Sequence, residues 1–374
     1  MKNLLKIIGF GVTFLAFTLN ASDFKYHPKD KKELIKLVQN QSINLGEIDT
    51  SKITDMSFLF ANITKEDCGF AQAKDACLEV AKEHKIKQIN LSLFGYNPIY
   101  IGDDKFDRKD FSGIDKWDTS RVTNMEGMFA QTENFNENIS SWDVSNVENM
   151  TAMFQDAKSF NQPLDKWNTA KVMRMSGMFN RASNFNQKLS SWDTSKVTDM
   201  SFMFYEAKKF NQNINSWNVS KVENMAGMFS ESISFNQPLN DWNVSSVKIM
   251  SQMFAGALKF NQPLDKWDTS KVIKMDAMFA NASSFNQNIN SWDVSKVRDM
   301  RMMFNKASSF NQPLDKWDVS NVVKMDLIFA NASSFRQNID NWKVKDFEEN
   351  DLFFMFHSSG LEKNLPKWSK NNLF

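Results

Sequence analysis

The chain has 374 residues, of which 42% are hydrophobic, and its 45 basic and 44 acidic side chains leave a formal net charge of +1. This near-neutral balance, without blocks of one sign, argues against nucleic acid as a partner. The 34 Phe, 22 Met and 11 Trp residues can bury a long continuous core.

Residues 1–22 have the pattern of a secretory signal peptide. Lys2 and Lys6 give a basic start, residues 7–19 form an uncharged apolar run, and small residues precede the first acidic residue, Asp23. The run is too short for a comfortable transmembrane helix, although a retained membrane anchor is the alternative. We expect an exported protein in the periplasm, on the cell surface or secreted, with no transmembrane span in the mature chain.

Residues 23–60 are expected to form an N-terminal cap followed by a first degenerate repeat. A helix is predicted after Pro28, where Leu34 and Val38 are among the apolar residues, and a short strand is predicted at residues 43–45. From Ile48 to Phe60 the chain reproduces the repeat described below, with Ile48 in place of Trp. Terminal units of a stacked array are atypical because they would otherwise expose its core.

Residues 61–110 interrupt the repeat and contain both cysteines, Cys68 and Cys77. An even pair in an exported chain predicts a disulfide. A metal site is disfavoured because His84 is the sole histidine nearby and no Cys-x-x-Cys spacing occurs. This insert either lies on the binding face, as insertions in repeat proteins often do, or is a stabilising lid over the first coils.

Residues 111–342 carry one 25-residue pattern, and no insertion or deletion breaks its frame from Trp117 to Trp342. The fullest copy starts at Phe260 as FNQPLDKWDTSKVIKMDAMFANASS. A fixed period of this length indicates units that bury their apolar face by stacking on neighbours, which is a solenoid. Ten tryptophans mark the period: Trp117, Trp142, Trp167, Trp192, Trp217, Trp242, Trp267, Trp292, Trp317 and Trp342.

Each unit is expected to contain one short helix and one short parallel strand. Ser145 and Glu148 have the spacing of a capping box at the start of the helix. The run Phe-Asn-Gln-x-Ile/Leu predicts the strand, although proline at its fourth position, as at Pro163, limits its hydrogen-bonded part. The alternative makes Val-x-x-Met a second short strand and reduces the helix to about one turn. The helical stripe is exemplified by Val147, Met150, Met153, Phe154 and Ala157.

Residues 343–374 degenerate in a way that suits a C-terminal capping repeat. Phe353 and Phe354 take the place of the Met-Phe pair, and Leu365, Pro366 and Trp368 close the chain. No Leu-Pro-x-Thr-Gly sorting signal is present, so covalent attachment to a cell wall is not supported.

The invariant columns are better explained as structure than as ligand sites. The Trp column could stack on sugars or bases, but it keeps register with the core columns and is expected to be core. The Asp or Asn after each Trp, as at Asp118, could bind calcium but fits a turn as well. An asparagine column is expected to form a ladder that bonds backbone groups between coils: Asn136, Asn161, Asn186, Asn211, Asn236, Asn261, Asn286 and Asn311.

No catalytic constellation is found. His27, His84 and His357 lie outside the regular repeats, and no unique pair of carboxylates stands out. The glycines at 127, 177 and 227 recur inside the predicted helical turn and do not form a phosphate-binding loop. We therefore expect no enzyme, no cofactor and no metal.

The unit W-D-[VT]-S-[KN]-V-x-x-M-x-x-M-F-x-x-A-x-x-F-N-Q-x-[IL] resembles the repeat of BspA-like bacterial surface proteins, a family grouped with leucine-rich repeats. The likeness is strong over residues 111–342 and looser over 43–60 and 347–368. It implies an α/β repeat solenoid with right-handed, leucine-rich-repeat-like coils, and attachment at the cell surface to host or matrix proteins. The family has no catalytic residues to carry over.

Two functions follow from these expectations. The first is an exported, non-catalytic recognition or adhesion module that binds another protein or a surface glycan. The second is a structural or scaffolding solenoid of the cell envelope with no specific ligand. A coherent apolar patch on one face would favour the first, and uniformly polar faces would favour the second.

Overall fold

The computed structural model describes residues 24–62, 90–92, 96–99, 108–344 and 354–370 of the chain. Within them no helix has the length and hydropathy needed to cross a membrane. Asn90–Ser92 (β1) and Tyr96–Ile99 (β2) pair as antiparallel strands. The regular elements are α1 (Lys31–Gln39), the 3-10 helices η2 (Leu45–Glu47) and η4 (Ile114–Lys116), the strands β1 (Asn90–Ser92) and β2 (Tyr96–Ile99), and α4 (Lys367–Lys370).

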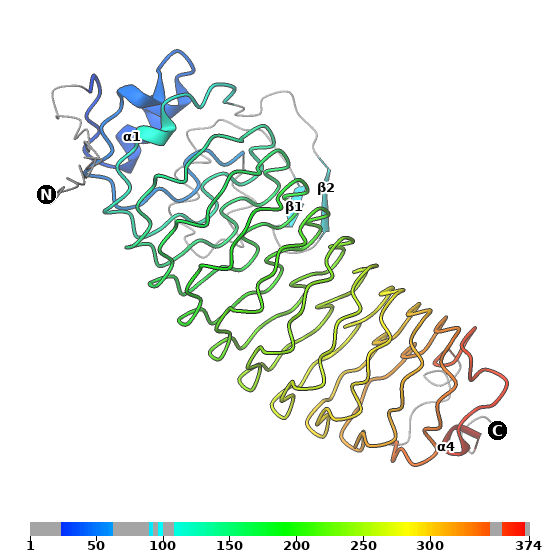
Figure 1. The fold of residues 1–374 in the computed structure, drawn as a ribbon. Helices are drawn as coiled ribbons and strands as arrows, with labels where there is room; N and C mark the ends of the chain where they lie inside the picture. Colours follow the sequence, from blue (N-terminus) through cyan, green and yellow to red (C-terminus); the bar gives the residue numbers. More distant parts are fainter. Residues whose placement is uncertain (1–23, 63–89, 93–95, 100–107, 345–353, 371–374) are drawn as a thin grey trace, which may run out of the picture.

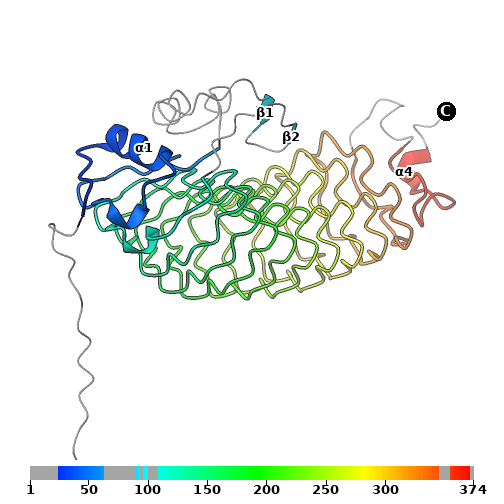
Figure 2. The same cartoon turned by 90° about the horizontal axis from the view of Figure 1, so that it is seen from above.

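Most of the described chain is a long stack of coils, one for each 25-residue unit, with α1 near one end and α4 near the other (Figures 1 and 2). Single parallel β-bridges join equivalent residues of successive coils, as between Asn149 and Arg174. The series of bridges runs from Asp55 to Lys324. Coils therefore contact their neighbours in the chain, which is the arrangement of a repeat array.

We call residues 148–156, and the equivalent residues of the other coils, the ladder segment. Alternate backbone N–H groups of this segment donate to the next coil at donor–acceptor distances of 2.7–3.0 Å. The four bonds of one coil run from Met150 to Arg174, from Ala152 to Ser176, from Phe154 to Met178 and from Asp156 to Asn180.

The ladder segment replaces the helix that the apolar stripe predicts. Ala152 and Asp156 have positive φ angles of 54° and 56°. The N–H groups of Met153, Gln155 and Ala157 donate to the carbonyls three residues earlier at 3.2, 3.0 and 3.1 Å. Residues 150–153 and 154–157 are consecutive type II turns, because each combines such an i to i+3 bond with a positive φ at its third residue, Ala152 or Asp156. The remaining N–H groups point to the next coil, so a helical ladder has no donors left.

The predicted capping box does not form either. Ser145 donates its N–H to Asp143 Oδ1 at 2.9 Å, and Glu148 donates its N–H to Thr123 of the preceding coil at 2.8 Å. The bridge residue Asn149 falls within the Val-x-x-Met run. The structure thus lies closer to the alternative that places an extended pairing there.

Glycines recur in the ladder segment because two of its positions need a left-handed backbone. Gly227 has a φ of 59°, and a Cβ built on it would lie 2.5 Å from the ring of Phe202 in the preceding coil. At Gly177, φ is 60°, but the nearest atom to such a Cβ is 3.8 Å away. Gly177 is therefore required only by its left-handed backbone, whereas Gly227 also leaves space for the ring of Phe202.

The core is built from the invariant columns. The ten tryptophans of the array are 2–4% exposed, and the Val, Met and Phe columns are buried beside them. Phe rings of successive coils stack almost parallel, for example Phe154 on Phe179 with centroids 5.6 Å apart and planes at 9°. Each coil thus buries its rings against those of the neighbouring coils.

The first degenerate repeat stacks directly on the regular array. Met56 donates its N–H to Asn124 at 3.0 Å, and the rings of Phe60 and Phe129 stack at 5.4 Å. Residues 61–110 therefore interrupt a coil whose two flanks pack together. The helix that the sequence predicts after Pro28 is α1. The strand predicted at residues 43–45 is instead a turn leading into η2, because Asn44 Oδ1 accepts the N–H of Gly46 at 2.8 Å.

The C-terminal coil has a register different from the predicted one. Phe329 donates its N–H to the carbonyl of Met355 at 3.1 Å, and its ring stacks on Phe356 at 6.0 Å. Met355 and Phe356 therefore fill the Met-Phe columns, and Phe354 is 51% exposed. Two additional residues in this last coil make the prediction for Phe353 and Phe354 wrong. Trp368 donates its Nε1–H to Ile339 at 2.9 Å and continues the tryptophan column.

Candidate binding surface

The tryptophan side chains of the array are buried in the core and hydrogen-bonded there. Trp217 donates its Nε1–H to the carbonyl of Leu189 in the preceding coil at 2.9 Å, and its ring lies parallel to that of Trp192 at 6.2 Å. The same type of bond, at 2.9–3.1 Å, is made by every tryptophan from Trp117 to Trp342. Buried and hydrogen-bonded indoles offer no face to a sugar or base.

The asparagine column forms a side-chain ladder between coils. Asn261 Oδ1 accepts the backbone N–H of Asn286 at 2.9 Å and the Nε2–H of Gln287 at 3.0 Å. From Asn136 to Asn311 each side-chain oxygen accepts the N–H of the residue 25 positions later, at 2.8–2.9 Å. The asparagine side-chain oxygens thus replace backbone carbonyls, which would accept these hydrogen bonds in a strand. Proline two residues later therefore breaks no ladder bond, and no strand is assigned to this run in the array.

The Asp or Asn after each tryptophan closes a turn. From Asp118 to Asp318, its Oδ1 accepts the N–H of the residue two positions later at 2.9–3.2 Å. The hydrogen bonds from Ser195, Ser270 and Ser320 lower the pKa of Asp193, Asp268 and Asp318. Among the described residues no group of three His, Cys, Asp or Glu side chains could hold a metal ion.

The histidines of the described chain lie at its two ends. His27 contacts Asp49 at 3.2 Å, and His357 lies 3.5 Å from Glu362. The predicted disulfide of Cys68 and Cys77, together with His84, falls outside the described residues. Among the described residues, candidate binding surfaces are therefore sought in the variable columns.

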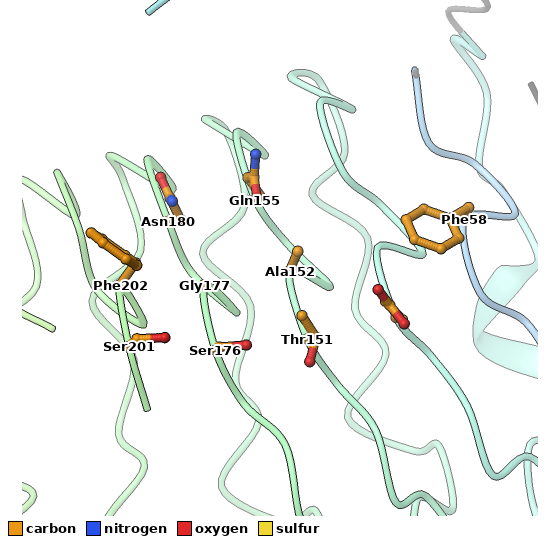
Figure 3. A pocket seen from close by; sticks show the side chains of 10 residues that line it. Phe58, Thr151, Ala152, Gln155, Ser176, Gly177, Asn180, Ser201 and Phe202 are labelled. Carbon is orange, nitrogen blue, oxygen red and sulfur yellow. The ribbon is translucent and has the colours of Figure 1, made fainter. Parts of the chain in front are cut away.

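Between the ladder segments of the N-terminal coils lies a small pocket whose lining includes several polar side chains (Figure 3). Its volume of about 20 Å³ is room for a single water molecule. Thr151 Oγ1, Gln155 Nε2 and Asn180 Oδ1 are buried there without a hydrogen-bond partner. A water could satisfy such atoms, and nothing larger fits, so this pocket is not a recognition site.

In the C-terminal coils the ladder segments are more open, and three exposed side chains on them form what we call the aliphatic patch: Ile273 and Val323 in the first column of the segment, and Met302 four residues further along in the coil between them. They are 40%, 40% and 52% exposed and lie on three successive coils. Arg298 donates its N–H to Ile273, and Val323 donates its N–H to Arg298, both at 3.0 Å. The backbones of the three coils are thus adjacent at this position, which places Ile273 and Val323 on either side of Arg298.

The exposed charges at the rim of the aliphatic patch are cationic, whereas the carboxylates near Arg301, those of Asp276, Asp299 and Asp326, are partly or fully buried. Lys274, Arg298 and Lys324 are exposed beside it. Arg301 is held by Asp299, with Nη2 and Oδ2 2.8 Å apart, and this carboxylate raises the pKa of the arginine. The sequence did not single out this surface, because its residues occupy variable columns. The sequence does show that aliphatic residues replace polar ones at those columns in these coils, and this replacement could have indicated the surface.

Comparison with known protein families assigns the repeats to a family. The family model described as Mycoplasma protein of unknown function, DUF285, matches residues 103–204, 187–289 and 259–368. Each match spans roughly four of the 25-residue units, and together they cover most of the chain. No curated protein matches this chain. By the extent of these three tandem matches, the chain belongs to the DUF285 family of Mycoplasma proteins of unknown function.

Proposed function

We propose that the chain is an exported, non-catalytic recognition module that is displayed at the cell surface and binds a protein partner through the aliphatic patch. The observation that carries the proposal is the exposure of Ile273, Met302 and Val323 on adjacent coils. The invariant columns of the array are either buried in the core or form hydrogen bonds that stabilise turns and join neighbouring coils. The resemblance to BspA-like surface proteins supports an adhesive role and a leucine-rich-repeat-like array.

The patch is large enough to contribute usefully to binding. Full burial of a large aliphatic side chain contributes about 1.5–3 kcal/mol. Ile273, Met302 and Val323 retain 40–52% of their exposure, so covering all three would contribute about 2–4 kcal/mol. This is a fraction of the total free energy of a specific complex, so polar contacts at the rim must supply the rest.

The charges around the patch indicate the chemistry of the partner. Lys274, Arg298 and Lys324 surround the aliphatic side chains. Apolar and acidic groups together on the partner would match this surface, and opposite charges would accelerate the encounter at low salt. An inert spacer has no use for exposed aliphatic side chains on consecutive coils.

The test measures binding of the purified chain from residue 23 onward to host-cell surfaces and to extracts of their matrix proteins. Ile273→Glu and Val323→Glu are expected to reduce binding at least tenfold, because each places a carboxylate in a desolvated contact. Met173→Glu is the matched control, since Met173 occupies the same column in an earlier coil and is 38% exposed. Equal binding by all three variants, or no binding by the natural chain, would instead support a scaffold.

A further inference from the structure

A second surface of the array is hollowed over the coils that contain Trp192 and Trp217. The cavity has a volume of about 590 Å³, and we call it the polar hollow. Sites for small ligands commonly measure about 300–1,000 Å³. Its lining carries amides, hydroxyls and one charge of each sign, and consists of Lys188, Ser190, Gln212, Asn213, Asn215, Ser216 and Asp241.

The hollow coincides with a break in the repeat. In the column that often contains proline, Lys188 and Asn213 form one of two places in the array where successive coils both lack it, the other being Gly113 and Asn138 at its start. The coils on either side carry Pro163 and Pro238. The ring of proline is lost over two adjacent coils, and the side chains that replace it are flexible and polar.

The same two coils carry small residues just before their tryptophans. Ser190 and Ser216 lie in the hollow, and Ser216 Oγ donates to the carbonyl of Ser190 at 3.0 Å. In the preceding coil the corresponding pair is Asp165 and Lys166. Small side chains in consecutive coils leave the space that larger pairs fill elsewhere.

One wall of the hollow is held in place by hydrogen bonds. Asp241 Oδ2 accepts from Asn215 Nδ2 at 2.7 Å, and its Oδ1 accepts from Lys266 Nζ at 2.9 Å. These two bonds and the charge of Lys266 lower the pKa of Asp241, so its carboxylate stays ionised as an acceptor. Asn215 also receives the N–H of Asp241 at 3.3 Å, which fixes the amide orientation.

The opposite wall carries a cation. Lys188 is exposed, and its ammonium forms no ion pair with any described residue. With Lys266 bound to Asp241, the three charged groups around the hollow sum to +1. A ligand here therefore meets fixed acceptors at one side and a free ammonium donor at the other.

We propose that the polar hollow binds a saccharide unit that carries a carboxylate, as in an oligosaccharide of hexuronic acid. Adjacent hydroxyls of a sugar both donate and accept, so they suit the Asp241 carboxylate and the Asn213 and Asn215 amides. The sugar carboxylate is placed toward Lys188, which forms a charge-assisted hydrogen bond. The hollow lacks the apolar lining that would hold the side chains of a peptide.

This inference rests on the proposed function, because it names a second ligand of a recognition module. The hollow is lined by residues that directly precede the tryptophans, whereas the aliphatic patch is formed by residues that follow them, and the two share no residue. Binding of protein and of saccharide are therefore separable by mutation.

The test measures binding of the chain from residue 23 onward to immobilised oligosaccharides of hexuronic acid, with neutral hexose oligosaccharides as comparison. One variant combines Lys188→Pro, Ser190→Asp and Ser191→Lys, which installs the QPLDKW sequence that three other coils already carry. The hollow is then filled without disturbing the fold, and we expect binding to fall at least tenfold. Lys188→Gln should remove the preference for acidic over neutral saccharide.

Asn288→Pro with Ser291→Lys is the matched control, since it makes similar changes in a distant coil, and its saccharide binding should be unchanged. Thermal melts verify that both combined variants remain folded. Retained binding in the filled variant, or no saccharide binding by the natural chain, overturns the inference. In either case, binding to host cells that still depends on Ile273 would leave the proposed function standing.

Discussion

Replacement of Trp217 by alanine is the sharpest perturbation of the array. The side chain is 3% exposed, stacks on Trp192 at 6.2 Å and contacts Phe204 with centroids 6.2 Å apart. Truncating a buried aromatic residue costs about 3–5 kcal/mol through lost transfer energy and the cavity. The carbonyl of Leu189 also loses the Nε1–H that it accepts, which costs about 1–3 kcal/mol.

The expected total loss is about 4–6 kcal/mol, because relaxation around the cavity recovers part of the sum. Since each coil contacts only its neighbours, the damage should concentrate at this coil. Denaturant melts should then show two transitions, one for each side of Trp217. Trp217→Phe retains most of the ring and should lose roughly 1–3 kcal/mol from the missing hydrogen bond and the smaller volume.

Lys221→Ala serves as the control, because Lys221 is exposed four residues later in the same coil. Its denaturation midpoint should stay within experimental error of the natural chain. An unchanged midpoint for Trp217→Ala would refute the core assignment of the whole tryptophan column.

Three further predictions concern other columns. Gly177→Ala should cost about 1 kcal/mol for its left-handed backbone, whereas Gly227→Ala should cost about 1–3 kcal/mol more because of the ring 2.5 Å from its new Cβ; equal midpoints would contradict this. Burial, then the charge of Glu206, raises the pKa of Glu231, so Glu231→Gln should be more stable than the natural chain at neutral pH. This advantage should shrink as the pH falls through the folded-state pKa toward the unfolded value of 4.5 in thermal melts. Asn261→Ala should lose about 1 kcal/mol or more in denaturant melts, because the N–H of Asn286 loses its acceptor while Gln287 keeps the backbone carbonyl of residue 261; Asn261→Asp, which keeps the side-chain acceptor, should lose less.

The sequence was sufficient to place the core columns and to anticipate the asparagine ladder. Trp217 and Asn261 recur in fixed register, and ten copies within one chain separate invariant from variable positions without an alignment. In the structure Trp217 is buried in the core, and Asn261 joins two coils by a hydrogen bond. Both residues recur in fixed register because these two roles tolerate little change.

The local conformation of the ladder segment was not predictable in the same way. Offsets of three and four residues between Met150, Met153 and Phe154 fit a helix and also a run of turns with two left-handed residues. What decides between them is the pairing of alternate N–H groups with the next coil, which is a tertiary contact. Alanine at position 152 gives no indication in the sequence that this residue has a left-handed backbone.

The candidate surfaces were visible only in part. Lys188 in the proline column is an evident departure from the repeat, but its consequence depends on the small Ser190 and Ser216 in adjacent coils. Ile273 and Val323 occupy variable positions, and their adjacency follows from the ladder. The register of Met355 was missed because two extra residues enter the last coil.

The central claim is that the invariant columns build the array and that departures from the repeat bind the ligands. Its most direct test is a chain in which both the aliphatic patch and the polar hollow carry the polar consensus residues of the other coils. Its binding to host-cell surfaces would be measured beside that of the natural chain, after matched thermal melts. We predict an unchanged melting temperature with binding reduced to background, whereas full binding by this consensus chain would contradict the account.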